Sequence, residues 1–185
     1  SAVLAGGVWS TLFCANHSLR LPQLKVRSAV MRTEPVVGGP DASVGGNGFG
    51  VRKRTDGGYT VANWSDNIAE IVPDSFRYFR DFQPLRKIQP GTAKLTFGKP
   101  FFTEYARPRK WNLGDVSPFE HVRMLDPEPI PAILNKARAA LVDAFPVFHD
   151  MKIAQAWGGA IDVTPDAVPV ISAVDWVPGF FIATG

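Results

Sequence analysis

The residue types that build most metal and nucleophilic sites are few in this chain and lie far apart. Three histidines, His17, His121 and His149, stand in unrelated segments without a carboxylate or thiol at ligand spacing. A zinc site needs about four such ligands in a defined geometry, so we predict no metal. The single Cys14 falls on a predicted helix with an apolar stripe, where a buried, unreactive thiol is expected. The G-x-S-x-G motif of hydrolases and the G-K-[ST] motif of phosphate loops are absent.

Positive charge is concentrated in the middle of the chain. The net charge is only +3, but residues 77–110 hold nine Lys or Arg and two acidic residues. These bases are scattered among Pro, Phe and Tyr instead of lining one helical face, and no recognised nucleic-acid motif accompanies them. We therefore favour a solvated or docking surface and predict no nucleic-acid partner.

The composition is that of a globular domain. With 45% hydrophobic residues and a mean hydropathy near zero, the chain can bury one good core. Its apolar stretches are far shorter than the ~20 residues of a membrane helix, so no membrane partner is predicted. No secretory signal is visible and one cysteine forms no internal disulfide, which predicts a cytoplasmic location.

The first twenty residues predict a short strand, a turn and a helix. Residues 2–5 are small and apolar and lead into a glycine turn, and residues 9–19 place Trp9, Leu12 and Phe13 on one helical face. Because a strand needs a neighbour, we expect residues 2–5 to pair with a strand outside the chain.

Alternating polarity over residues 24–31 predicts a strand with one packed face. A glycine-rich loop is expected over residues 37–48. Residues 49–54 and 59–63 are predicted to form a hairpin around residues 55–58 (TDGG), because Asp and Gly adopt turn conformations that other residues resist.

Several short helices are expected between residues 74 and 107, where prolines interrupt longer ones and Asp74 is placed to cap the first. The longest helix is predicted over residues 129–144, where apolar residues recur at spacings of three and four, and Pro146 ends it. Strands are predicted over residues 152–158, 168–172 and 180–184. The irregular order of strands and helices indicates an α+β fold with a mixed, largely antiparallel sheet flanked by helices.

Three segments of the chain resemble one protein family. They are VLAGGVWS at residues 3–10, AWGGAIDVTPDAVPVI at residues 156–171, and PGFFIATG at residues 178–185. In this order they resemble the D-amino-acid oxidase family of FAD-dependent oxidoreductases, in which small residues let the backbone approach the flavin. The cofactor that this resemblance implies is FAD.

The resemblance also implies a division of the chain. Residues 1–20 and 161–185 are similar to parts of the family's α/β flavin-binding domain, and residues 21–160 to its substrate-binding domain. The G-x-G-x-x-G fingerprint that binds the FAD pyrophosphate is absent. We therefore expect a fragment that is inactive alone and that lacks FAD-binding segments as partners.

The resemblance supplies the candidate site residues. Several amino-acid oxidases of the family hold the substrate carboxylate with an arginine two residues after W-x-G, and Ile161 stands there in this chain. Arg52 or Arg54 is expected to replace that arginine, or the substrate is an amine or a modified amino acid. The candidates on the flavin side are Ala5, Gly6, Gly7, Trp9, Thr184 and Gly185. On the substrate side they are Phe49, Arg52, Tyr59 and Ile161, with ordinary sheet packing or a surface role as the alternative.

The function that the resemblance implies is oxidation of the C–N bond of an amino acid or amine to an imine, with the flavin accepting the hydride. One alternative is a non-catalytic assembly module of a flavoprotein complex that docks a partner through its basic middle segment. A nucleic-acid binder is a weaker alternative. We expect self-association if the terminal strands expose unpaired edges.

Overall fold

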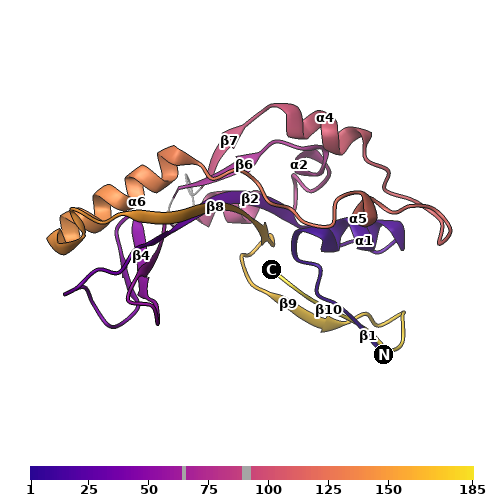
Figure 1. Cartoon of the computed structure of the whole chain (residues 1–185). Helices are drawn as coiled ribbons and strands as arrows, with labels where there is room; N and C mark the ends of the chain where they lie inside the picture. Colours follow the sequence, from indigo (N-terminus) through magenta and orange to yellow (C-terminus); the bar gives the residue numbers. More distant parts are fainter. Residues whose placement is uncertain (64–65, 89–92) are drawn as a thin grey trace.

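Two β-sheets form the framework of the molecule (Figure 1). The computed structural model describes residues 1–63, 66–88 and 93–185. Within these residues the large sheet has the order β3-β4-β5-β2-β6-β7, with β8 also pairing with β2, and the small sheet has the order β1-β10-β9. The strands are β1 (Ala2–Leu4), β2 (Leu24–Thr33), β3 (Val44–Gly46), β4 (Phe49–Lys53), β5 (Tyr59–Ala62), β6 (Asn67–Glu70), β7 (Ala93–Thr96), β8 (Ile153–Val163), β9 (Val170–Ala173) and β10 (Phe180–Thr184).

The helical elements are short apart from one. They are η1 (Gly7–Trp9), α1 (Ser10–Asn16), α2 (Pro73–Arg77), α3 (Gln83–Ile88), α4 (Lys99–Ala106), α5 (Pro118–His121), α6 (Pro131–Ala144) and η2 (Pro146–Phe148). The α+β class and the mixed, largely antiparallel sheet flanked by helices are therefore confirmed. No helix in the described residues is both long and apolar enough to span a bilayer.

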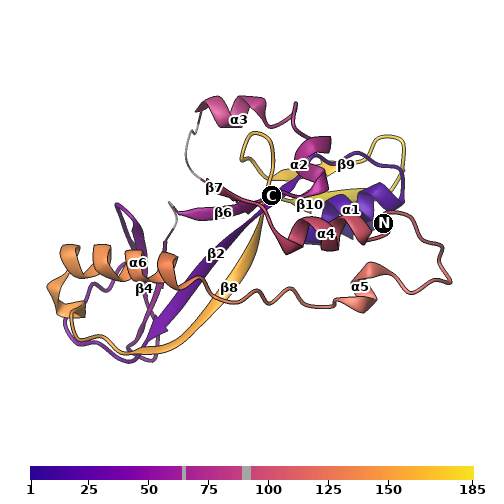
Figure 2. The same cartoon turned by 90° about the horizontal axis from the view of Figure 1, so that it is seen from above.

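The long antiparallel pair of β2 and β8 joins the two ends of the molecule (Figure 2). The strand predicted over residues 24–31 is confirmed, whereas the one predicted over residues 152–158 continues to Val163. It continues because residues 158–163 find a partner in the first half of β2, with Leu24 opposite Val163. The strand thus runs without a break across the domain boundary predicted between residues 160 and 161, which stays a prediction.

The predicted hairpin of β4 and β5 is confirmed, and its turn is held by the Asp56 carboxylate, which accepts a hydrogen bond from the Gly58 amide at 3.0 Å. The prediction of a loop over residues 37–48 is wrong in part. Residues 44–46 form β3, which pairs with β4 around Asn47 and Gly48. Gly48 has a φ of +82°, so the Asn-Gly pair acts as a hairpin turn.

Helix α6 confirms the predicted long helix and supplies the core. Its buried face packs on β4 and β5, and the following Pro146 begins η2, as expected for a residue that ends a helix. Figure 1 shows α6 lying along the large sheet. The buried cluster consists of Met31, Phe49, Val51, Tyr59, Val61, Ala137, Leu141, Phe148 and Met151.

The middle of the chain contains the predicted short helices and one strand pair that the sequence did not indicate. β6 and β7 pair in parallel, with α2 and α3 in the connection between them. The prediction that Asp74 caps a helix is wrong, because Pro73 occupies the first helical position and Val72 is the N-cap. Asp74 instead accepts hydrogen bonds from Arg77 and, at 2.7 Å, from Arg109.

The prediction that residues 2–5 have no partner in the chain is also wrong. β1 runs parallel to β10, with Ala2 opposite Phe180 and Leu4 opposite Ile182. A second apolar cluster, with Cys14, Leu21, Val174 and Ile182 buried, packs beneath this small sheet. The two termini of the chain therefore lie in one structural unit.

Candidate functional site

The three segments that resemble the flavin-dependent family meet where β8 and β10 end. The carboxylate of Asp162, near the end of β8, accepts hydrogen bonds through Oδ2 from Thr184 Oγ1 at 2.6 Å and from the Gly185 amide at 2.8 Å. The Gly6–Gly7 turn lies against the same carboxylate, since a Cβ added to Gly7 would stand 3.9 Å from Asp162 Oδ1. Four of the six predicted flavin-side residues are thus brought together: Gly6, Gly7, Thr184 and Gly185.

A buried glutamine completes this junction. The side chain of Gln23 is 2% exposed and donates through Nε2 to Asp162 Oδ2 at 2.8 Å and to Thr184 Oγ1 at 2.9 Å. Its Oε1 accepts a hydrogen bond from the Thr11 amide in α1. One polar network therefore ties the beginning of β2, helix α1, and the ends of β8 and β10.

Sequence reasoning did not identify Asp162 or Gln23. A signal was present for Asp162, which is a carboxylate inside an otherwise apolar strand run of residues 160–163. A partly buried carboxylate needs hydrogen-bond donors, so its position already implied a polar partner from elsewhere in the fold. Gln23 directly precedes a strand and carried no comparable signal.

The other two predicted flavin-side residues lie at either end of the turn. Ala5 is exposed between β1 and the turn. The Trp9 ring packs between the guanidinium carbon of Arg107, 4.9 Å from its centroid, and the Phe119 ring, edge-on at 5.4 Å. The segment that follows α4 therefore holds Trp9 in place.

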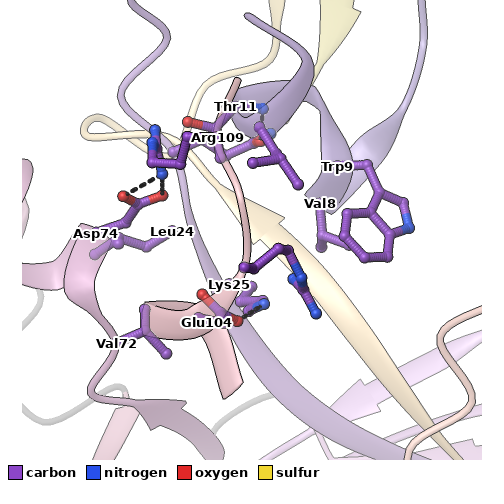
Figure 3. A pocket seen from close by; sticks show the side chains of 12 residues that line it. Val8, Trp9, Thr11, Leu24, Lys25, Val72, Asp74, Glu104 and Arg109 are labelled. Atoms are coloured by element: carbon purple, nitrogen blue, oxygen red, sulfur yellow. Dashed lines mark hydrogen bonds and ion pairs between the residues drawn. The ribbon is translucent and has the colours of Figure 1, made fainter. Parts of the chain in front are cut away.

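Beside Trp9 is a cavity of about 40 Å³ (Figure 3). Its wall is both polar and apolar, and its charges are largely paired, Lys25 with Glu104 and Arg109 with Asp74. A cavity of this size holds a few water molecules and is too small for an amino acid or a flavin ring. We interpret it as part of the contact between α1, α4 and the start of β2.

The predicted substrate-side residues are divided between the two faces of the large sheet. Phe49 and Tyr59 are 4% and 0% exposed and belong to the core beneath α6, which favours the packing alternative for both. Ile161 is 47% exposed, and Arg52 is also exposed. Opposed residues of antiparallel strands share a face, so the pairings place Ile161 with Val26, and Arg52 with Thr60, on the face away from α6. We call this the open face.

The open face begins at the Asp162 junction. Ile161 lies one residue before Asp162, and a Cβ added to Gly159 would meet no atom within 4 Å. The adjacent row of opposed residues, Trp157, Val30 and Ala62, is only partly buried. An accessible apolar strip therefore leads away from the glycine turn.

The residues at the junction fit the flavin that the resemblance implies. Gly7 has a φ of +50°, and a side chain there would occupy space that only Asp162 borders. Gly185 has a φ of +117° and is exposed. A side chain at Gly185 would meet the Pro169 Cα at 2.9 Å, so that glycine lets two parts of the chain approach each other, whereas Gly7 leaves space beside an accessible sheet face where a flat ring could approach.

No group of three or more His, Cys, Asp or Glu side chains gathers into a metal-binding arrangement among the described residues. Cys14 is buried as predicted, and burial raises the pKa of its thiol to about 11. Because the folded state retains the thiol proton, ionisation of Cys14 should not change the free energy of unfolding below pH 9. It should lower that free energy as the pH rises from 9 toward 11.

Cys14 should be almost inert toward thiol reagents in the folded protein. At pH 8 we expect its reaction with DTNB to be about 100-fold slower than in urea, because both the thiolate fraction and the access of the reagent are reduced. The absorbance of the released thiol measures both rates, and similar rates in the two conditions would contradict the burial of Cys14.

The chain is similar to known proteins of one family. The family described as FAD dependent oxidoreductase matches residues 1–185. The structure of L-amino acid deaminase from Proteus vulgaris is 30% identical with a TM-score of 0.89, covering 99% of this chain and 43% of that chain. The enzyme from Proteus myxofaciens, in complex with anthranilate, is 34% identical with a TM-score of 0.91, covering 98% and 41%.

A curated relative gives a shorter match. The sarcosine oxidase subunit beta of Arthrobacter sp is 40% identical over 40 residues, which are 22% of this chain and 10% of that protein. The chain thus spans about two-fifths of the solved deaminases that it resembles. From the match over its whole length, the chain belongs to the family of FAD-dependent oxidoreductases.

Proposed function

We propose that the protein of which this chain is part oxidises the C–N bond of an amino acid or amine to an imine, which then hydrolyses. One observation carries this proposal. Three segments distant in sequence, containing Gly7, Asp162 and Gly185, meet at one end of an open, largely apolar sheet face. The deaminases that the chain resembles act on L-amino acids, and one of them is in complex with anthranilate.

Bound FAD would accept the two electrons, and the chain would position the substrate and exclude water. The glycine turn and the Thr184–Gly185 segment would hold the flavin edge, while the strip around Ile161 and Gly159 would contact the substrate. Arg54 pairs with Asp56, and Arg52 lies toward the far end of the open face, about 20 Å from the junction, so neither is favoured as the partner of a carboxylate next to the oxidised C–N bond. The apolar Ile161 favours an amine or an amino acid whose carboxylate is held by another group.

The visible absorbance spectrum tests this proposal. The protein expressed from the complete open reading frame should show flavin bands, and anaerobic addition of its substrate among L- and D-amino acids and secondary amines should bleach them. The product should react as a keto acid or aldehyde with a hydrazine reagent. Absence of flavin from the folded complete protein would overturn the proposal.

A second candidate function is a role in assembly. Four aromatic side chains on and near α2 and α4 are more than 60% exposed: Phe76, Phe97, Phe102 and Tyr105. Exposed aromatic patches commonly mark interfaces. A homo-oligomer in light scattering, or a second polypeptide that co-purifies without flavin, would favour assembly. The cytoplasmic location stays a prediction.

A further inference from the structure

The open face ends in a polar row at the end opposite to the Asp162 junction. Thr60 of β5 is opposed by Arg32 of β2 on one side and by Arg52 of β4 on the other. Strand spacing places the two arginine Cα atoms roughly 10 Å apart. The preceding row of opposed residues, with Met31, Val61 and Val51, lies in the core, so the polar row points the other way.

Two donors of this row have no acceptor among the residues that the structure describes. Arg32 Nε and Thr60 Oγ1 are both buried and without a hydrogen-bond partner. Neither Arg32 nor Arg52 forms an ion pair within the described residues. A buried donor without an acceptor destabilises the fold, and a ligand oxygen would relieve this cost.

Two of the carboxylates near this row are already engaged. Asp56 accepts a hydrogen bond from the Gly58 amide and pairs with Arg54. These two partners hold the pKa of the Asp56 carboxyl below its ordinary value, and the charge of Arg32 makes a smaller contribution. Asp41 pairs with Lys53 on the opposite face of β4. Two guanidinium groups therefore share one surface, and neither forms an ion pair with these two carboxylates.

We propose that Arg32, Thr60 and Arg52 form a binding site for an oxyanion, either a carboxylate or a phosphate. The arginines supply planar forks of N–H donors, which match these groups in bidentate geometry, and the threonine hydroxyl donates between them. Val26 opposes Ile161 on β2, so the site lies six residues, or about 20 Å, from the junction along that strand. If the proposed function holds, the site would fix an anionic group distant from the oxidised C–N bond.

The test is a calorimetric titration of the complete protein with inorganic phosphate and, separately, with glutarate at low ionic strength. Arg32→Gln and Arg52→Gln should each weaken binding at least tenfold. Lys53→Gln is the matched control, because it removes the same charge from the adjacent residue, whose side chain lies on the other face. Tighter binding of phosphate would identify a phosphate ligand, and tighter binding of glutarate a carboxylate ligand.

Two outcomes would overturn the site. One is no binding of either anion. The other is equal affinity in the unchanged protein and in the Arg32→Gln, Arg52→Gln and Lys53→Gln variants, which would mean an adventitious ion only. Circular dichroism of each variant would exclude misfolding as the cause of lost binding, and Thr60→Val should weaken binding by a smaller factor. The titration needs neither flavin nor turnover. Its result is therefore separate from a failure of the proposed enzymatic function.

Discussion

Replacing Gly158 by alanine is expected to lower the free energy of unfolding by about 3 kcal/mol or more. A Cβ at Gly158 would overlap the backbone carbonyl oxygen of Pro127 and stand 2.8 Å from that of Glu128. Arg27 Nη2 also donates to this Glu128 oxygen at 3.0 Å, which holds the crossing segment close to β8. Because the obstacle is backbone, no rotation of a side chain can relieve the overlap.

Gly159→Ala is the control for this prediction. Gly159 is the next residue of β8, faces the open side of the sheet, and has no atom within 4 Å of an added Cβ. We expect its stability to change by less than about 0.5 kcal/mol. Urea unfolding followed by circular dichroism measures both variants. Equal effects would show that the segment containing Pro127 does not cross β8 closely.

Replacing Asp162 by alanine is expected to cost about 2–4 kcal/mol of stability. The change leaves three donors without their acceptor: Gln23 Nε2, Thr184 Oγ1 and the Gly185 amide. Gln23 is buried at 2% exposure, so water would not readily replace the carboxylate. Under the proposed function, the complete protein should also retain less flavin, because the Thr184–Gly185 segment would lose its attachment beside the glycine turn.

Two further variants sharpen this test. Asp162→Asn keeps the shape and one oxygen acceptor, so its effect should be smaller than that of Asp162→Ala. Asp175→Ala, at an exposed position in the turn after β9, should change stability by less than about 0.5 kcal/mol. Urea unfolding gives the stability, and the flavin absorbance per protein gives cofactor retention. If Asp162→Ala behaved like Asp175→Ala, the junction would not depend on this carboxylate.

Local patterns in the sequence predicted the elements whose formation depends on neighbouring residues. The hairpin of β4 and β5 follows from alternating side chains around an Asp-Gly-Gly turn. Helix α6 follows from apolar residues at spacings of three and four, three of which are its buried contacts. The Asn-Gly turn before β4 was an equally local signal, which the glycine-rich composition around it obscured.

The same patterns did not reveal which segments would be neighbours. β1 was expected to pair outside the chain, although β10, almost the full chain length away, lies beside it. The parallel pairing of β6 with β7 is likewise a contact between segments separated by two helices. Phe49 and Tyr59 were candidates for substrate contact, and the register of the sheet turned both toward α6.

The sequence by itself determined the α+β class, the principal helix and hairpin, and, through three short motifs, the family and its flavin. Local propensities and motif spacing are properties of the chain, so they can be read without coordinates. Only the tertiary structure decided that Gln23 reaches Asp162, 139 residues away, and that Arg32 and Arg52 face the open side of the sheet. Such contacts depend on strand register, and a shift of one residue would turn each of these side chains to the opposite face.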